Sequence, residues 1–366
     1  MKNVKIILAV VLSIVILGLC VLLGIGLSGR VPGGRTGWGG GSWDGRYQLV
    51  QEQEFPAKDI NTIDIEYTKS GNDVTLYEAE GDSVIVREYA SYEPADGELA
   101  QMKCQSGKLT VKGPRRYNTF FQINRHIYTE VYVPGDFAGQ LKIATVSGEI
   151  SLTMDLVLSG QLNLTSTSGD IYAGSQSFEA EKINVSSTSG EIRLPALEAG
   201  EINMSTTSGD ISVKEAEGYV SCSSTSGEII VSGGAGDREI SSTSGDVRVD
   251  GFSGSISVNT TSGEIFLRGD RGCGSLHSTS GDVLFSVEEL TGDISVNTVS
   301  GEVSLELPET ISLDFEADSA SGDINTFFDG SLSFSKRGNH ASGIVGSGER
   351  RAKITTTSGD ITIRKK

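Results

Sequence analysis

The sequence predicts an all-β protein: a β-solenoid (β-helix) of 18–21-residue repeats that follows one N-terminal transmembrane helix. Three observations lead to this prediction. A short motif, Ser-Gly followed by Asp or Glu and then Ile or Val, recurs along most of the chain. Apolar and polar residues alternate on both sides of each motif, as they do in strands with one buried face. One long, nearly unbroken apolar run lies close to the start of the chain.

The apolar run covers residues 6–27 and follows Lys2 and Lys5. As a helix it would be about 33 Å long, which matches the hydrocarbon core of a bilayer. A cleaved signal peptide is the alternative, but its apolar region is normally shorter. Lipidation at Cys20 is a further alternative, although the bulky Leu19 precedes that cysteine. We therefore predict an uncleaved single-pass anchor over residues 1–28, with the rest of the chain outside the cytoplasm.

Residues 29–46 are rich in glycine and predict a flexible linker, in which Trp38 and Trp43 would lie at the level of the lipid headgroups. Residues 47–140 keep the strand-like alternation but lack the motif, so we expect degenerate β-repeats that cap the solenoid at its N-terminal end. Within this cap, Ser70-Gly71 and Ser106-Gly107 resemble degenerate corners. Residues 141–366 are predicted to be the regular β-solenoid.

Each motif glycine marks a corner between two strands. The positions seven, five and three residues before the glycine, and two and four after it, are apolar or small and should face the core. Glycine can adopt the positive φ that a tight corner often needs. We expect one repeat per coil, with coils about 4.8 Å apart. The predicted corner glycines are Gly148, Gly169, Gly190, Gly209, Gly227, Gly245, Gly263, Gly281, Gly301, Gly322 and Gly359.

The C-terminal part of the array is less regular, because 37 residues separate the last two corner glycines. Ser347-Gly348-Glu349 resembles the remnant of one degenerate repeat within this interval. The segment from Phe327 to Lys353 is basic, which indicates either a patch for an anionic polymer or a loop that covers the rod. Arg364, Lys365 and Lys366 would place positive charge on the last strand and discourage pairing between rods.

The acid after each glycine alternates strictly between Glu and Asp through the consecutive repeats. Either a two-repeat unit was duplicated or one coil contains two repeats. Stacked coils would align these carboxylates in a column, where a calcium ladder is one interpretation. The other, which we favour, is that each acid accepts a backbone N–H bond at its own corner. The residues of this acidic ladder are Glu149, Asp170, Glu191, Asp210, Glu228, Asp246, Glu264, Asp282, Glu302 and Asp323.

The repeat array resembles that of a known family. The array of Thr-x-Ser-Gly-Asp/Glu-Ile units, preceded by a strand that ends in Tyr132-Val133-Pro134-Gly135, is similar to the bacterial "putative adhesin" family of β-strand-repeat proteins. That family is a domain of unknown function, and some of its membrane-anchored members are linked to Lia-type envelope-stress systems. The resemblance covers roughly residues 60–366 and implies a location in the cell envelope. It implies no catalytic residues.

The composition narrows the classes of function. A formal net charge of −18 argues against a nucleic-acid partner, since phosphates need a basic surface. Cys222 falls at a core position, and Cys273 and His277 lack a third catalytic partner. The glycosylation sequons at Asn163, Asn184, Asn203 and Asn259 fall in repeat strands, so we interpret them as products of the repeat.

We therefore expect no enzyme and no cofactor. The predicted function is a surface-displayed adhesion, interaction or envelope-stress module, bound to the membrane through its N-terminal helix, with a cell-wall polymer or an envelope protein as partner. A self-assembling β-helix scaffold is the first alternative, and a polysaccharide-acting enzyme is the second.

Overall fold

The computed structural model describes residues 47–366, except for residues 69–70, 96, 115–125, 328–331 and 336–337. These residues belong to one compact unit that runs from Gly45 to Lys366. The predicted anchor and glycine-rich linker lie outside the described residues. Within the part that is described, no helix is long and apolar enough to cross a membrane.

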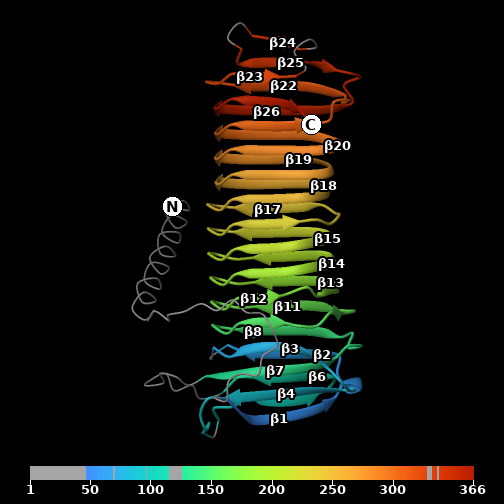
Figure 1. Ribbon diagram of the computed structural model, residues 1–366, viewed down its shortest axis with the longest axis vertical. Coiled ribbons are helices and arrows are strands. Elements are labelled where there is room, and N and C mark those ends of the chain that lie inside the picture. The colour runs from blue at the N-terminus through green and yellow to red at the C-terminus, as the bar shows by residue number, and fades with distance from the viewer. Residues whose placement is uncertain (1–46, 69–70, 96, 115–125, 328–331, 336–337) are drawn as a thin grey trace, which may run out of the picture. The chain divides into compact units, whose positions relative to one another are not determined.

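The described chain is almost entirely strand (Figure 1). The N-terminal elements are β1 (Gln48–Pro56), the 3-10 helix η1 (Ala57–Asp59), β2 (Thr62–Tyr67), β3 (Asp73–Ala79), β4 (Ser83–Ala90), β5 (Gln101–Gln105), β6 (Lys108–Lys112) and β7 (Ile127–Pro134). The central strands are β8 (Gln140–Thr145), β9 (Ile150–Leu152), β10 (Leu156–Val157), β11 (Gln161–Thr165), β12 (Ile171–Ala173), β13 (Ser177–Ser186), β14 (Ile192–Ser205), β15 (Ile211–Ser224), β16 (Ile229–Ser232), β17 (Arg238–Ser242), β18 (Val247–Ser262), β19 (Ile265–Ser280) and β20 (Val283–Ser300). The C-terminal strands are β21 (Val303–Leu307), β22 (Leu313–Ser319), β23 (Ile324–Thr326), β24 (Ser333–Phe334), β25 (His340–Val345), β26 (Arg350–Ser358) and β27 (Ile361–Lys365).

One repeat makes one coil of a parallel β-solenoid, as predicted. Ile171 pairs with Ile192, Ile192 with Ile211 and Ile211 with Ile229, so equivalent positions of successive repeats lie side by side. The β-branched and small side chains of the repeat suit such a pleated, half-buried surface. In Figure 1 the coils stack as parallel layers along the long axis of this unit.

Each coil contributes up to three paired segments. The first face contains the strands before the Ser-Gly corner, such as β8, β11 and the end of β13. The second face contains the strands after the corner, such as β9, β12 and the start of β14. A third face closes the coil and contains β10, the start of β13 and the middle of β14. Inward side chains from these faces form one continuous core, which no repeat could bury alone.

The N-terminal end is capped by antiparallel strands. β2 and β3 form the first parallel coil, and β6 and β7 lie beneath them. β4 pairs antiparallel with β7, β1 pairs antiparallel with β4, and β5 pairs antiparallel with β6. Ser106 and Gly107 have φ values of 53° and 78° and form the turn of the β5–β6 hairpin. The prediction of a degenerate corner at these two residues is therefore wrong.

A buried polar network fastens this cap. The Tyr67 hydroxyl donates to Glu88 Oε1 at 2.9 Å, and the Ala100 N–H donates to Glu88 Oε2 at 2.9 Å. The Thr129 hydroxyl donates to the Tyr67 oxygen at 2.7 Å. Burial raises the pKa of Glu88 above its ordinary value, and the two hydrogen bonds that it accepts oppose this shift without cancelling it.

At the C-terminal end the spatial order of the coils differs from the chain order. β26 pairs with β20 on one side and with β22 on the other, and β27 likewise lies between β21 and β23. The last strand of the chain is therefore inside the stack, and the prediction that its charges protect an open end is wrong. The segment between β23 and β26 is no degenerate coil either, because β25 pairs antiparallel with β22 and forms a cap with β24.

Candidate functional site

The Ser-Gly corners of successive coils stack in one column, and the structure gives a different reason for glycine than the sequence suggested. A Cβ atom on Gly169 would lie 2.0 Å from the carbonyl oxygen of Gly148, and one on Gly227 would lie 1.8 Å from that of Gly209. Among the eleven corner glycines, only Gly281 and Gly359 have a φ in the positive region. Close backbone approach between coils, rather than positive φ, requires glycine at most of these corners.

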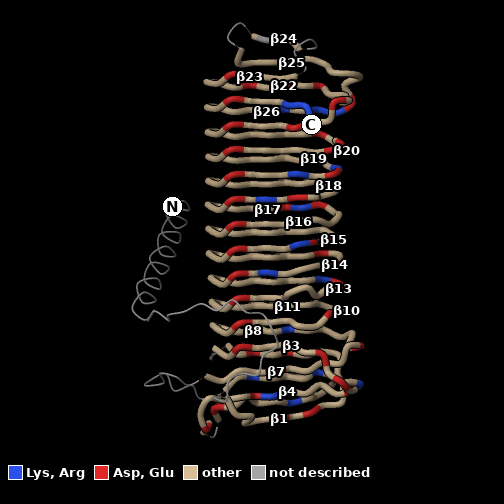
Figure 2. Tube along the Cα trace, in the orientation of Figure 1, with Lys and Arg blue, Asp and Glu red and all other residues tan. Residues whose placement is uncertain are grey.

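The acidic ladder follows the same column, and Figure 2 shows acidic residues at this corner of successive coils. Every Asp carboxylate of the column except that of Asp323 accepts a hydrogen bond from the backbone N–H of the acid in a neighbouring coil. Asp170 accepts from Glu191 at 2.8 Å, and Asp210 accepts from Glu228 at 2.9 Å. The same bond joins Asp73 to Glu149, Asp246 to Glu264, Asp282 to Glu302 and Asp360 to Asp323.

These bonds give the Asp/Glu alternation a physical meaning. Aspartate is one methylene shorter than glutamate, so its carboxylate stays close to the backbone and reaches the amide of the adjacent coil. We predicted that each acid bonds at its own corner, but the N–H belongs to the next coil. Since Asp360 lies between Glu302 and Asp323 in space, the alternation runs unbroken from Asp73 to Asp360 in the folded stack. The ladder consists of coil pairs, each joined through one aspartate.

The Ser or Thr three residues before each glycine is buried at every corner, as expected. In the coils from Gly169 to Gly245, this hydroxyl accepts the glycine N–H, for example in Ser166–Gly169 at 2.8 Å and Thr206–Gly209 at 3.0 Å. In the coils of Gly263, Gly281 and Gly301 the glycine N–H donates instead to a serine carbonyl of the next coil. The hydroxyls of those three coils have no hydrogen-bond partner among the described residues; they belong to Thr260, Ser278 and Thr298.

At the N-terminal end of the ladder, two carboxyl groups have raised pKa values. Burial raises the pKa of Asp73 and of Glu149, and for Glu149 the neighbouring Asp73 and Asp170 carboxylates raise it further. Within the described ranges, no group of three Asp, Glu, His or Cys side chains could hold a metal ion. The calcium alternative therefore stays a prediction.

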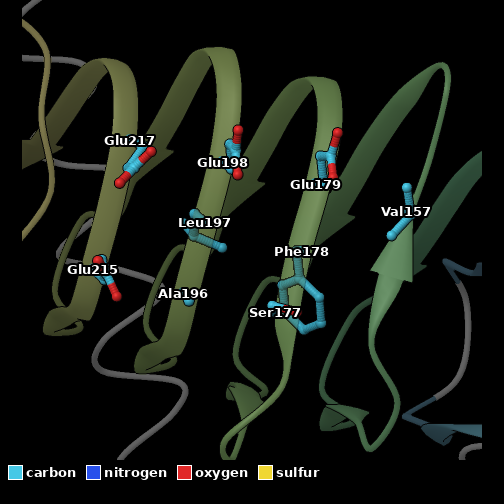
Figure 3. Close-up of a pocket in the computed structure, with 9 residues that line it drawn as sticks. All are labelled: Val157, Ser177, Phe178, Glu179, Ala196, Leu197, Glu198, Glu215 and Glu217. Atoms are coloured by element: carbon cyan, nitrogen blue, oxygen red, sulfur yellow. The ribbon is translucent and has the colours of Figure 1, made fainter.

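A second acidic feature lies on the third face, where sequence analysis found no motif. A shallow groove of about 240 Å³ is lined by Val157, Ser177, Phe178, Glu179, Ala196, Leu197, Glu198, Glu215 and Glu217 (Figure 3). Glu179, Glu198 and Glu217 pair in register across three coils, and Glu215 lies two residues before Glu217. Among the residues that the structure describes, no Lys or Arg forms an ion pair with these four glutamates. The groove therefore presents like charges at about the 4.8 Å spacing of the coils.

The remaining candidates are not brought together into a site. Cys222 is 1 % exposed, and burial raises the pKa of its thiol to about 12, so it is a core side chain as predicted. Cys273 is partly buried on β19, whereas His277 points outward from the same strand. Cys104 is exposed on β5. No described neighbour completes a catalytic arrangement with any of them.

The sequon asparagines instead form a structural ladder on the first face. Asn184 Nδ2 donates to Asn163 Oδ1 at 2.8 Å, and Asn203 Nδ2 donates to Asn184 Oδ1 at 3.0 Å. Such amide ladders are a regular product of in-register stacking. Asn259 lies on β18 in the same repeat context.

The basic C-terminal segment is partly neutralised. Arg351 and Lys353 on β26 reach Glu316 of β22 at 3.2 Å and 3.7 Å. Two further basic residues of the segment, Lys336 and Arg337, lie outside the described residues, and Arg350 is the first residue of β26. Arg351 and Lys353 therefore form cross-strand ion pairs between β26 and β22.

Arg238 was missed by sequence analysis. It occupies an inward position where other coils carry Leu, Ile or Val, and it is 2 % exposed. Its guanidinium donates to the carbonyls of Gly233, Gly234 and Gly236 at 2.7–2.8 Å. The glycine-rich third face of this coil supplies no side chains to the core. The long Arg238 side chain therefore fills the core at this level and donates hydrogen bonds to the carbonyls of the glycine-rich loop. Burial lowers its pKa from the ordinary value.

Comparisons with known proteins identify the family of this chain. The model of the Toastrack DUF4097 family matches residues 60–249 and 234–364. No curated protein matches the sequence. Several solved structures are similar. One, from Clostridium sporogenes, is described as a "putative cell adhesion protein"; it is 12 % identical, with 87 % of this chain and 100 % of that chain covered and a TM-score of 0.21.

Two further structures are described as a "putative adhesin". The one from Bacteroides fragilis is 15 % identical, with 71 % of this chain and 97 % of that chain covered and a TM-score of 0.35. The one from Parabacteroides merdae is 14 % identical, with 73 % and 98 % covered and a TM-score of 0.40. The family match extends over most of the described solenoid. The chain therefore belongs to the Toastrack DUF4097 family, a domain of unknown function, and the resemblance noted in its sequence is confirmed.

Proposed function

We propose that this chain is a non-catalytic protein of the cell envelope, in which the solenoid acts as an adhesion, interaction or envelope-stress module outside the cytoplasm. The apolar segment within residues 1–28 is its membrane anchor, and the glycine-rich residues 29–46 hold the solenoid away from the bilayer. The partner is a wall polymer or another envelope protein.

The observation that carries this proposal is the regular display of side chains along the solenoid. In-register pairing sets outward residues of successive coils in straight columns, such as Asn163, Asn184 and Asn203 on the first face. A second column, Glu179, Glu198 and Glu217, lies on the third face. Columns with a fixed spacing suit a partner that itself repeats, or a protein that contacts several coils at once.

The end caps favour this function over a self-assembling scaffold. Stacking of solenoids end to end requires open parallel coils at both ends. Here the outermost strands at the N-terminal end are β1 and β5, and both pair antiparallel with their neighbours. At the C-terminal end β25 and β24 add an antiparallel layer over β22. A second molecule would have to pair with these caps rather than continue the parallel stack.

Protease treatment of intact cells tests the proposal. The full-length protein carries a C-terminal epitope tag, and cells are treated with protease before and after lysis, with membrane fractionation alongside. We expect loss of the tag from intact cells while an N-terminal tag stays with the membrane. If the solenoid is digested only after lysis, the topology is wrong and a scaffold inside the cell replaces this function.

A further inference from the structure

A second hollow lies at the N-terminal end, on the outward side of β5 and β6. It measures about 450 Å³ and is lined by Gln101, Lys103, Gln105, Ser106, Lys108, Thr110 and Lys112. These residues alternate with Met102, Leu109 and Val111, which point into the core. The hollow is therefore built on a rigid two-stranded surface, and every second residue of both strands faces it.

Thr110 lies at the centre of this arrangement. It is directly opposite Lys103 in the β5–β6 pairing, and Lys108 and Lys112 lie two residues away on either side. Gln101 faces Lys112 and Gln105 faces Lys108 across the two strands. The Thr110 side chain is short and the three lysines around it are long, so a hollow forms above Thr110. The lysine ammonium groups and the glutamine amides of both strands line this hollow.

The charges around the hollow do not cancel. On the neighbouring strand β2, Asp64 lies 2.5 Å from Lys108, while Glu66 lies 3.7 Å from Lys112. Lys142 of β8 offsets part of the negative charge of these two carboxylates, because its ammonium group lies 2.7 Å from Glu66 and 3.5 Å from Asp64. Four lysines thus face two carboxylates, and Lys103 forms no ion pair with any residue that the structure describes. In a chain of net charge −18, this surface has the opposite sign.

We propose that the hollow formed by Lys103, Lys108, Lys112 and Thr110 binds phosphate groups of an anionic polymer of the envelope. This inference deepens the proposed function and rests on it. Lysines bind phosphate as point charges, whereas planar carboxylates are better matched by the paired N–H groups of arginine, which is absent from this hollow. The amides of Gln101 and Gln105 and the Thr110 hydroxyl add neutral hydrogen-bond donors.

A polymer fits better than a single ion. Lys108 and Lys112 are four residues apart on one strand, or about 13 Å along its axis. The acceptor groups of a phosphodiester chain are spread over a comparable length, so one chain can contact several ammonium groups together. Each contact adds modestly and is weakened by salt, because the lysines are exposed.

Binding of the full-length protein to medium-chain polyphosphate tests this proposal, with neutral dextran as the control polymer. The variants are Lys103→Gln and the pair Lys103→Gln with Lys112→Gln. Lys214→Gln is the matched control, since Lys214 is an exposed lysine on β15, which Figure 1 shows far along the stack from β6, the partner strand of β5. Thermal unfolding of each variant shows whether the fold is kept. Lys103 faces solvent and has no described ionic partner, so its replacement should leave stability unchanged.

We expect polyphosphate to bind, with a dissociation constant about fivefold weaker for each hollow lysine removed, from the usual contribution of a basic side chain at an anionic surface. Lys214→Gln should bind as the original protein does, and raising salt from 0.05 to 0.3 M should weaken binding strongly. The proposal is overturned if polyphosphate does not bind, or if Lys214→Gln loses as much affinity as Lys103→Gln.

Two further measurements distinguish a phosphate polymer from a lipid surface or free phosphate, and distinguish failure of this proposal from failure of the proposed envelope function. Binding only to anionic phospholipid vesicles, with none to soluble polyphosphate, would overturn the polymer assignment in favour of a lipid surface. Binding of inorganic phosphate alone, with no gain for the polymer, would overturn it too. If polyphosphate binds as predicted but protease reaches the solenoid only after lysis, the hollow stands and the proposed envelope function fails.

Discussion

Two groups of coils in this molecule have the same corner motif but different hydrogen bonds. In the coils from Gly169 to Gly245, a buried Ser or Thr hydroxyl accepts the glycine N–H within its own coil. In the coils of Gly263, Gly281 and Gly301, the glycine N–H donates to the next coil, and the hydroxyl is left without a partner. The corner sequence is Thr-Ser-Gly in all of these coils except that of Gly301, where it is Val-Ser-Gly.

The difference shows that the motif fixes the shape of the corner more firmly than its hydrogen bonds. β18, β19 and β20 continue as strands up to the serine before the glycine, whereas the earlier strands end several residues sooner. Because these strands extend to the corner, the glycine N–H donates to a backbone carbonyl of the next coil. The Ser or Thr hydroxyl is then no longer needed as its acceptor. An inward hydroxyl that is redundant costs free energy, because it is desolvated without compensation.

The largest effect should come from the requirement that both groups share. Gly227→Ala would place a Cβ 1.8 Å from a backbone oxygen, and Gly263→Ala would place one at 2.3 Å. Neither oxygen belongs to a flexible side chain, so the coils must separate locally. We expect each change to lower the free energy of unfolding by about 3 kcal/mol or more. Urea denaturation measures it, and Gly81→Ala, where nothing lies within 4 Å of the added carbon, is the control. Equal, small losses at all three positions would contradict the close-approach explanation.

Replacing the corner hydroxyl should separate the two groups. Thr206→Val removes the acceptor of the Gly209 N–H and leaves a buried donor unsatisfied, which should cost about 1–3 kcal/mol. Thr260→Val removes only an unpaired buried hydroxyl, so it should be neutral or slightly stabilising. Thermal and urea unfolding of the two variants give the comparison directly. A similar loss in both would mean that the two kinds of corner are energetically alike.

A smaller effect is expected from the acids, and it should depend on the residue type. Asp210→Ala removes the acceptor of the Glu228 N–H and should cost about 1 kcal/mol. Glu228→Ala removes a carboxylate for which no such bond is found among the described residues, so the loss should be under about 0.5 kcal/mol. Unfolding at pH 7 in moderate salt is the measurement. The coil-pair interpretation fails if the glutamate proves as important as the aspartate.

The smallest expected effect concerns the N-terminal cap and its pH dependence. Burial raises the pKa of Glu88 above its ordinary value of 4.5, so between these two values the folded protein binds more protons than the unfolded chain. The contribution of Glu88 to stability is thus present below the unfolded pKa and is lost as pH rises through the folded pKa. Glu88→Gln should flatten this part of the profile, measured by urea unfolding between pH 4 and 8. An unchanged slope would show that Glu88 titrates normally.

Much of the solenoid could be predicted because its signal is repeated. The inward positions follow from alternation within one motif. The Glu/Asp alternation left open whether a coil holds one repeat or two, and the stacking of Ile150, Ile171 and Ile192 confirms the preferred single repeat. What the motif could not show is pairing between distant segments. Ser106-Gly107 and a true corner look alike locally, and only the antiparallel pairing of β5 with β6 separates them.

The candidate sites were predictable to different degrees. The acidic ladder was visible as a column, but the partner of each aspartate lies one coil away, so its bonds could not be assigned from one repeat. The groove at Glu179, Glu198 and Glu217 was missed because the residues of the third face follow no pattern that recurs from repeat to repeat. Arg238 was missed because a charged residue at a core position makes sense only beside a coil face made of glycine.

The insertion of β26 and β27 within the stack has a consequence for folding during synthesis. From β8 to β21 the coils leave the ribosome in spatial order, so each can pair with the coil before it as it emerges. The next coil in space consists of β26 and β27, and at ordinary translation rates the 59 residues from 308 to 366 take about 3–12 s to produce. During that interval β20 and β21 present unpaired edges, and β22 and β23 have no parallel neighbour to join. The gap between the coil of β20–β21 and the coil of β22–β23 is thus closed by strands that are synthesised after both of its sides.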